Sequence, residues 1–229
     1  KIAWRNLAKN KKSTAINVLG LALGLTIFIL ISLWIQHSIQ FDHYHKNHDK
    51  VGQLYQAQTS NGEIFTGQMV PRPLEQELKT NYADQFEHIV MASWIDDYVL
   101  SHEEKHLTQV GIFMDSGAPD MLTLDLLEGD YQALSEPGSI MLSNSVAKAM
   151  FGEGNAVGQL MKINQAMDVK VTAVYKDLPD NTTFKDIKFI APWSLYIKSE
   201  PWIEQNKDRW DNNSFQCFVQ LAAGKDMAT

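Results

Sequence analysis

One segment of the chain matches a known catalytic motif in its residue types and their spacing. His102, Glu103 and His106 satisfy the pattern H-E-x-x-H, in which two histidines one helical turn apart bind zinc and the glutamate acts as a general base. That chemistry requires a helix, because a helix brings residues four apart onto one face. The flanking residues 98–100 and 107–110 are strand-like instead. We therefore expect the polar residues between them to form the tip of a β-hairpin.

A zinc site would also need a third ligand. The chain has no histidine after His106, although an aspartate or glutamate could serve. A membrane-anchored zinc hydrolase built on these three residues is therefore the least favoured alternative, and bound zinc would be its test. We expect no catalytic, cofactor-binding or metal-binding residue in this chain, and no cofactor.

A second group of candidate ligands lies earlier, where His43, His45 and His48 fall within QFDHYHKNHDK. No cysteine accompanies them, and spacings of two and three do not place all three on one helix face. The sequence therefore predicts a solvated connector over residues 37–50 rather than a metal site.

The connector follows the stretch that organises the chain, residues 16–35, INVLGLALGLTIFILISLWI. Its twenty residues lie in a longer run without Asp, Glu, Lys or Arg, and at about 1.5 Å per residue they match a hydrocarbon layer of roughly 30 Å. A cleaved signal peptide has a shorter apolar region that ends at small residues, whereas Leu33, Trp34 and Ile35 stand here. The stretch predicts a retained transmembrane helix.

Charge is distributed unequally on the two sides of this helix. Five basic residues and no acidic residue precede it. The region after it contains the remaining 15 basic residues and all 27 acidic ones, which gives it a formal charge of −12. The positive-inside rule places the N-terminus in the cytoplasm and the acidic region outside it. An acidic exterior argues against nucleic acid as a partner. The single cysteine, Cys217, cannot form an internal disulfide.

The region after the helix alternates strand and helix patterns. Residues 51–59 and 64–70 predict a hairpin around Asn61-Gly62, and residues 74–82 predict a helix. Ser143 is the expected cap of a helix over residues 144–151 that Gly152 ends. Further strands are expected at 89–94, 112–114, 139–142, 160–163, 169–175, 187–191 and 215–221. Helices are expected after Pro119 and over 194–210, the latter interrupted by Pro201. The fold class expected from these elements is α+β.

Five collinear segments resemble one protein family. They are IAWRNLAKNK at 2–11, FDHYHKNHDKVGQLYQ at 41–56, SIMLSNSVAKAMFGEGNAVG at 139–158, VTAVYKDLPDNTTF at 171–184 and FVQLAAGKD at 218–226. The chain is similar to MacB/FtsX-type ABC transporter permeases, with a MacB-like periplasmic core domain, and most of all to the large permeases of Bacteroidetes-like bacteria. Ala173 and Thr183 depart from residues common in that family, and neither position carries known chemistry.

The resemblance implies a permease subunit in the bacterial inner membrane. The residues themselves predict a cytoplasmic interfacial helix (1–15), or a basic flank that only fixes the topology, then a transmembrane helix (16–36) and a juxtamembrane connector (37–50). The resemblance implies two mixed α/β periplasmic subdomains after them, the outer from 51–110 and 184–229 and the inserted from 111–183. Further transmembrane helices or a second permease copy, and a periplasmic adaptor or substrate protein, are implied as partners. The periplasmic part would transmit ATP-driven motion, for export or for mechanotransmission.

The chain has no G-x-x-x-x-G-K-[ST] phosphate loop, so we expect a separate cytoplasmic ATPase subunit to hydrolyse ATP and the chain itself not to be an enzyme. The alternative from another class is the sensor domain of a membrane receptor, which has the same layout of basic tail, span and acidic exterior. The residues that follow Thr229 in the parent protein would distinguish the two.

Overall fold

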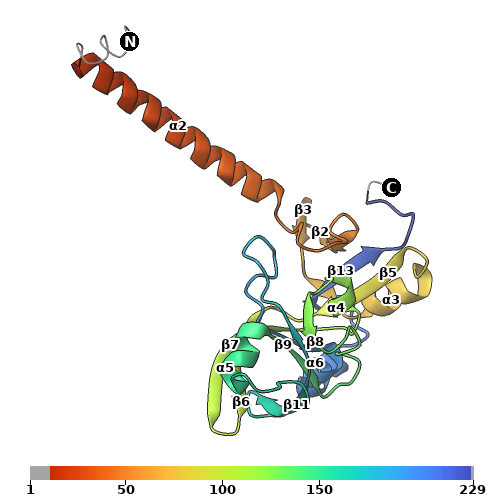
Figure 1. Ribbon diagram of the computed structural model, residues 1–229. Helices are drawn as coiled ribbons and strands as arrows, with labels where there is room; N and C mark the ends of the chain where they lie inside the picture. The colour runs from red at the N-terminus through yellow and green to blue at the C-terminus, as the bar shows by residue number, and fades with distance from the viewer. Residues whose placement is uncertain (1–10, 228–229) are drawn as a thin grey trace. The chain divides into compact units, whose positions relative to one another are not determined.

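The computed structural model describes residues 11–227. It forms two compact units, Lys1–Asp42 and His43–Thr229 (Figure 1). The predicted interfacial helix falls largely on residues 1–10, which lie outside the described part, and residues 11–15 belong to the helix that follows.

The first unit consists of the helix α2, Lys11–Ile39. Its 29 residues extend about 44 Å at 1.5 Å per residue, and the helix is long and apolar enough to cross a membrane. Two of its hydroxyl groups bond within the helix: Thr26 Oγ1 donates to the Ala22 carbonyl (2.8 Å), and Ser38 Oγ donates to the Trp34 carbonyl (3.0 Å). Such bonds satisfy polar groups where lipid offers no partner. The predicted apolar helix is confirmed, and it is longer at both ends than the 16–36 expected.

The second unit contains the described strands and the shorter helices. The strands are β1 Val51–Gln53, β2 Gln56–Ser60, β3 Glu63–Gly67, β4 Val70–Pro71, β5 Phe86–Ala92, β6 Asp96–His102, β7 Lys105–Met114, β8 Leu126–Glu128, β9 Ser139–Ser143, β10 Leu160–Ile163, β11 Met167–Tyr175, β12 Phe189–Pro192 and β13 Asn213–Leu221. The helices are α3 Pro73–Asn81, α4 Ala118–Met121, α5 Asn144–Phe151, α6 Trp193–Ser199 and α7 Pro201–Gln205.

Eleven of the described strands form one mixed sheet, in the order β1-β13-β5-β7-β12-β9-β11-β10-β6, with β4 paired to β13 and β8 to β11. Because β6 also pairs with β7, the strands β7, β12, β9, β11, β10 and β6 close a ring (Figure 1). Within the ring, β12 runs parallel to β7 and β11 parallel to β9, and the other pairs are antiparallel. The strands β2 and β3 form a separate hairpin.

Successive residues of the ring strands face two different hydrophobic cores. Phe113, Leu142 and Phe189 belong to the first core, which also contains apolar residues of α5 and α6. Ile112, Met141 and Ile190 belong to the second core, together with residues of α4. This is the period-two alternation of a strand that is covered on both faces.

Close packing in the first core requires a glycine on β7. Gly111 pairs with Phe189 on β12, and a Cβ atom at Gly111 would lie 2.1 Å from the Phe189 ring. Real Cβ contacts of this length do not occur, so the position excludes any side chain while the phenyl ring stays in place.

Several local predictions are confirmed. The β2–β3 hairpin turns at Asn61 and Gly62, whose φ angles of 52° and 83° are those of the primed turn that Asn-Gly favours. Ser143 caps α5, with its side chain accepting a hydrogen bond from the Val146 amide, and Gly152 ends it at φ 69°.

Three element predictions differ in part from the structure. The helix expected to carry Met121, Leu122 and Leu124 ends at Met121, because Thr123 adopts φ 46° and breaks the helical path. The helical stretch over 194–210 is divided at Pro201 as expected, into α6 and α7, and it is shorter than expected because α7 ends at Gln205. The strand expected over 51–59 is divided into β1 and β2.

The fold class is α+β as expected, an N-terminal apolar helix followed by a sheet-rich domain. The predicted boundary between residues 110 and 111 falls inside β7. The ring takes β6 and β12 from the predicted outer subdomain and β9, β10 and β11 from the predicted insert, and His43–Thr229 forms one compact unit. The division into two subdomains stays a prediction, for which independent folding would be the test.

Candidate functional site

The H-E-x-x-H segment forms the β6–β7 hairpin rather than a helix. His102 pairs across the hairpin with Lys105, and His106 pairs with Ser101, one position further along. Because paired residues share a face and neighbouring positions alternate, His102 and His106 lie on opposite faces. His102 Nδ1 bonds the Leu160 carbonyl at 2.8 Å, and His106 Nδ1 bonds Ser101 Oγ at 2.9 Å. The expected hairpin tip is confirmed, and the two histidines cannot bind one ion together.

Glu103 at the turn has φ 50°, which is left-handed backbone. Within the described residues, no group of three or more His, Cys, Asp or Glu side chains is placed to hold a metal ion.

The connector histidines differ from one another in burial. His43 and His48 are exposed and their rings stack, with centroids 4.1 Å apart. His45 is buried, with 4% of its surface exposed. Its Nδ1 lies 2.5 Å from the Leu122 carbonyl oxygen, and its Nε2 lies 3.0 Å from Thr182 Oγ1. The prediction of a solvated connector is therefore wrong for His45, because its partners supply the hydrogen bonds that water would otherwise provide.

The contacts of His45 also assign its tautomer. A carbonyl oxygen only accepts, so Nδ1 of His45 carries the proton that is donated to Leu122. In the neutral ring, Nε2 then accepts from the Thr182 hydroxyl. Both polar atoms of a buried side chain are thus used to hold the connector.

Neighbouring residues attach the part of the connector that belongs to the second unit, residues 43–50, at further points. The Lys46 amide donates to Thr123 Oγ1 at 2.9 Å, and Asn47 Nδ2 donates to Gln220 Oε1 of β13 at 3.4 Å. Tyr44 packs against the second core. The left-handed Thr123, which ended α4, thus presents its hydroxyl to the connector. The connector is bound along its length to the second unit, and β1 continues directly from it.

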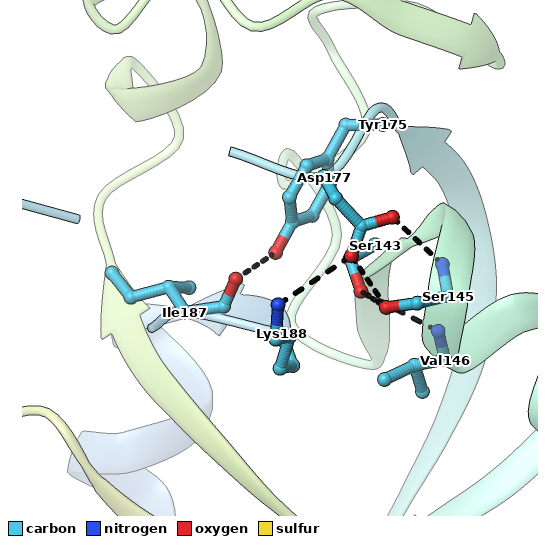
Figure 2. Close-up of polar contacts among 7 residues, drawn as sticks. All are labelled: Ser143, Ser145, Val146, Tyr175, Asp177, Ile187 and Lys188. Atoms are coloured by element: carbon cyan, nitrogen blue, oxygen red, sulfur yellow. Dashed lines mark hydrogen bonds and ion pairs between the residues drawn. The ribbon is translucent and has the colours of Figure 1, made fainter. Parts of the chain in front are cut away.

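A polar cluster at the start of α5 was not expected from the sequence. The Asp177 carboxylate accepts from the Ser145 amide (2.9 Å) and from the Ser145 hydroxyl, and Lys188 Nζ lies 3.5 Å from it (Figure 2). Nearby, the Tyr175 hydroxyl donates to the Ile187 carbonyl at 3.2 Å. The cluster joins α5 to the segments on either side of the β11–β12 connection.

A serine, a carboxylate and a lysine can support nucleophilic chemistry, but their geometry here is that of a cap. The Ser145 hydroxyl donates to the carboxylate of Asp177, and that carboxylate is too weak a base to remove the hydroxyl proton, because its pKa is lowered. Burial raises the pKa of Asp177, but hydrogen bonds from Ser145 and the charge of Lys188 outweigh burial, so the pKa falls below its ordinary value. An ionised carboxylate at a helix N-terminus stabilises the helix.

The ring meets the strands β5 and β13 at a short joint. β5 and β7 share one register pair, Ala92 with Met114. Side-chain hydrogen bonds connect the two strands further on either side of this pair. Asp115 Oδ2 accepts from the Met91 amide at 2.8 Å, and Ser93 Oγ accepts from the Phe113 amide at 3.0 Å. Burial, with a further contribution from the charge of Glu75, raises the pKa of Asp115 to about 7, although the Met91 amide and the charge of Lys79 oppose this.

An apolar helix long enough to cross a membrane, joined to a sheet-rich α+β domain, is the layout of a membrane-tethered protein. A family model for the MacB-like periplasmic core domain matches residues 14–229. The chain belongs to the MacB-like periplasmic core domain family, as the five collinear segments led us to expect. A search of curated proteins found no match.

Solved structures share this fold. A domain assigned to a permease protein from Porphyromonas gingivalis is 17% identical with a TM-score of 0.63, covering 80% of this chain and 77% of that one. The periplasmic region of MacB from Actinobacillus actinomycetemcomitans is 13% identical with a TM-score of 0.56, covering 80% of this chain and 78% of that one. At these identities the likeness concerns the fold.

Proposed function

We propose that the chain is part of the permease subunit of an ABC transporter in the bacterial inner membrane. Its family is that of a permease periplasmic domain, and α2 supplies a candidate membrane span. The five basic residues before the apolar stretch of α2 and the acidic balance after it support a cytoplasmic N-terminus and a periplasmic second unit. Because the sequence carries no phosphate loop, a separate cytoplasmic ATPase subunit would supply ATP hydrolysis.

The second unit would couple ATP-driven motion to export or to mechanotransmission across the envelope, through residues 41–50. The observation that carries this proposal is the attachment of His45, a buried side chain in a polar ten-residue segment. A segment that is hydrogen-bonded at successive residues moves together with the body that it contacts. A flexible linker would absorb the same displacement.

The test compares three forms of the full-length permease, reconstituted with its ATPase subunit: the natural chain, a chain with a Gly/Ser segment in place of residues 41–50, and the single variant His45→Phe. Hydrogen exchange of the second unit is measured with and without trapped nucleotide, together with ATP turnover. We expect nucleotide to change exchange in the natural chain, and both variants to lose much of that change while they continue to hydrolyse ATP.

His43→Phe is the matched control, because His43 is exposed and its ring stacks on that of His48, whereas the hydrogen bonds of His45 go to Leu122 and Thr182. An unchanged nucleotide response in the Gly/Ser form would refute the coupling role of residues 41–50. Failure to recover any ATPase subunit with the full-length protein would instead refute the permease assignment.

A further inference from the structure

A row of aromatic side chains runs through the first core and ends at the surface. Neighbouring ring centroids along it lie 5.0–5.5 Å apart. Its members, in order, are Tyr98, Phe113, Tyr196, Trp193, Phe215 and Trp202. The last ring, Trp202 on α7, stacks on Phe215 with an interplanar angle of 10° and is 37% exposed.

A second tryptophan reaches the surface and contacts the same end of β13 as the first. Trp94, in the segment between β5 and β6, donates from Nε1 to the carbonyl of Ser214 at 2.9 Å, and Ser214 precedes the Phe215 on which Trp202 stacks. Trp94 is 37% exposed, and Ile95 after it is 38% exposed. Large apolar side chains gathered on a surface in this way are typical of interaction sites, in which tryptophan is among the strongest anchors.

Two carboxylates accompany these side chains. Asp96 follows Ile95 in the sequence, and Glu200 accepts a hydrogen bond from Trp202 Nε1 at 3.2 Å. Burial raises the pKa of Tyr196, and the charges of Glu200 and Asp96 raise it further, so both carboxylates lie near the same tyrosine. Within the described residues neither forms an ion pair, and nor does the exposed Asp97.

Most nearby cations already have acidic partners. Arg72 and Lys207 both pair with Glu204, and Arg209 pairs with Asp211. The exposed Lys198 stands two residues before Glu200. It offsets one of the three carboxylates Asp96, Asp97 and Glu200, so the local balance stays negative.

We propose that the surface formed by Trp94, Ile95, Asp96, Glu200 and Trp202, the aromatic-acidic surface, binds an arginine- or lysine-bearing segment of a partner protein. A guanidinium group can stack on an indole ring and pair with a carboxylate at the same time. The surface contains two indole rings, Trp94 and Trp202, and two carboxylates, Asp96 and Glu200. The apolar part of the segment would cover Ile95. This goes beyond the proposed function and does not depend on it, because binding to the purified chain is independent of membrane orientation.

The test uses the full chain in nanodiscs of zwitterionic lipid and a fluorescein-labelled peptide that alternates arginine with leucine and serine, followed by fluorescence anisotropy. Asp96→Asn/Glu200→Gln removes both carboxylates without changing side-chain size. Glu103→Gln/Glu104→Gln is the matched control, since it removes two charges at the far end of the same hairpin, about 20 Å along β6 from Asp96 at about 3.3 Å per residue.

We expect the surface variant to weaken peptide binding about fivefold and the control by less than about twofold, as for two exposed ion pairs of about 0.5 kcal/mol each. Trp94→Ala should weaken binding by a similar factor. A peptide with citrulline in place of arginine should bind more weakly to the natural chain.

Other outcomes would overturn the proposal. Equal losses in the two charge variants would show general attraction to an acidic protein. Competition by free arginine amide at the same concentration as the peptide would show a site for a small cation instead of a polypeptide segment. Should Trp94→Ala disturb folding, as judged by its thermal melt, the isosteric charge variant and the citrulline peptide still decide the question.

Discussion

Replacing Asp115 by asparagine should change how the stability of the second unit depends on pH. In the folded chain, burial and the charge of Glu75 raise the pKa of Asp115 to about 7, against the opposing Met91 amide and Lys79. The buried thiol of Cys217 also faces this group. Because the folded state holds its proton more tightly than the unfolded state, stability falls as the pH rises from about 4 to about 7. An asparagine oxygen can still accept from Met91 and does not titrate.

The size of the effect follows from the two pKa values. With about 7 in the folded chain and about 3.9 in the unfolded chain, the natural protein loses roughly 2.5 kcal/mol between pH 5 and pH 8 that the variant keeps. Asp115→Asn should therefore stabilise the protein at pH 8, and its advantage should shrink toward pH 5.

The assay is urea unfolding of the full chain in detergent at a series of pH values, followed by tryptophan fluorescence. Asp168→Asn is the control, because Asp168 is exposed and paired with Lys162. Parallel pH profiles for the natural chain and Asp115→Asn would contradict the assignment of a proton to Asp115 near neutral pH.

Two further substitutions test packing and capping by the same unfolding assay. Gly111→Ala places a methyl group 2.1 Å from the Phe189 ring and should lower the free energy of unfolding by about 3 kcal/mol. The control Gly67→Ala, at a position with open space, should lower it by less than about 1 kcal/mol. Equal losses of stability in the two variants would show that Phe189 moves freely. Ser143→Ala removes the side-chain cap of α5 and should lower the free energy of unfolding by about 1 kcal/mol. The control Ser194→Ala, at an exposed position, should leave stability nearly unchanged. No loss of stability in Ser143→Ala would mean that Asp177 alone caps the helix.

Features whose determinants lie close together in the sequence could be predicted. The apolar helix, the Asn61-Gly62 turn and the Ser143 cap each depend on residues within one short segment. The β6–β7 hairpin was predicted for the same reason, since the strand-like flanks of the histidine motif outweigh the motif itself.

The anchor of the connector could not be predicted from the sequence. His45 is buried by partners 77 and 137 residues further along the chain, Leu122 and Thr182, and no local pattern reports such a contact. The prediction of a helix that includes Leu124 was wrong, because the same spacing of apolar residues is compatible with a helix and with a turn that packs against a core. Thr123 decides between them by a left-handed conformation that threonine seldom adopts.

The cap at Asp177 and the closure of the ring could not be predicted for the same reason, since both depend on contacts between residues far apart in the sequence. Asp177 meets Ser145 across 32 residues, and the pairing of β6 with β10 joins Leu100 to Ile163. A register between strands that are not neighbours in sequence is set by the packing of side chains in the completed sheet. Hydrophobic alternation predicts that these segments are strands, without naming their partners.

The closed ring has a consequence for how the domain can deform. Each ring strand is hydrogen-bonded on both sides, so sliding one strand by a single register would break two ladders and exchange the side chains that face the two cores. A pull on one strand is therefore shared around the whole circumference, and the ring yields by tilting as a stiff body. Strain applied to the domain should then concentrate where fewer hydrogen bonds join its parts, at the short β5–β7 joint and in the loops that hold the connector.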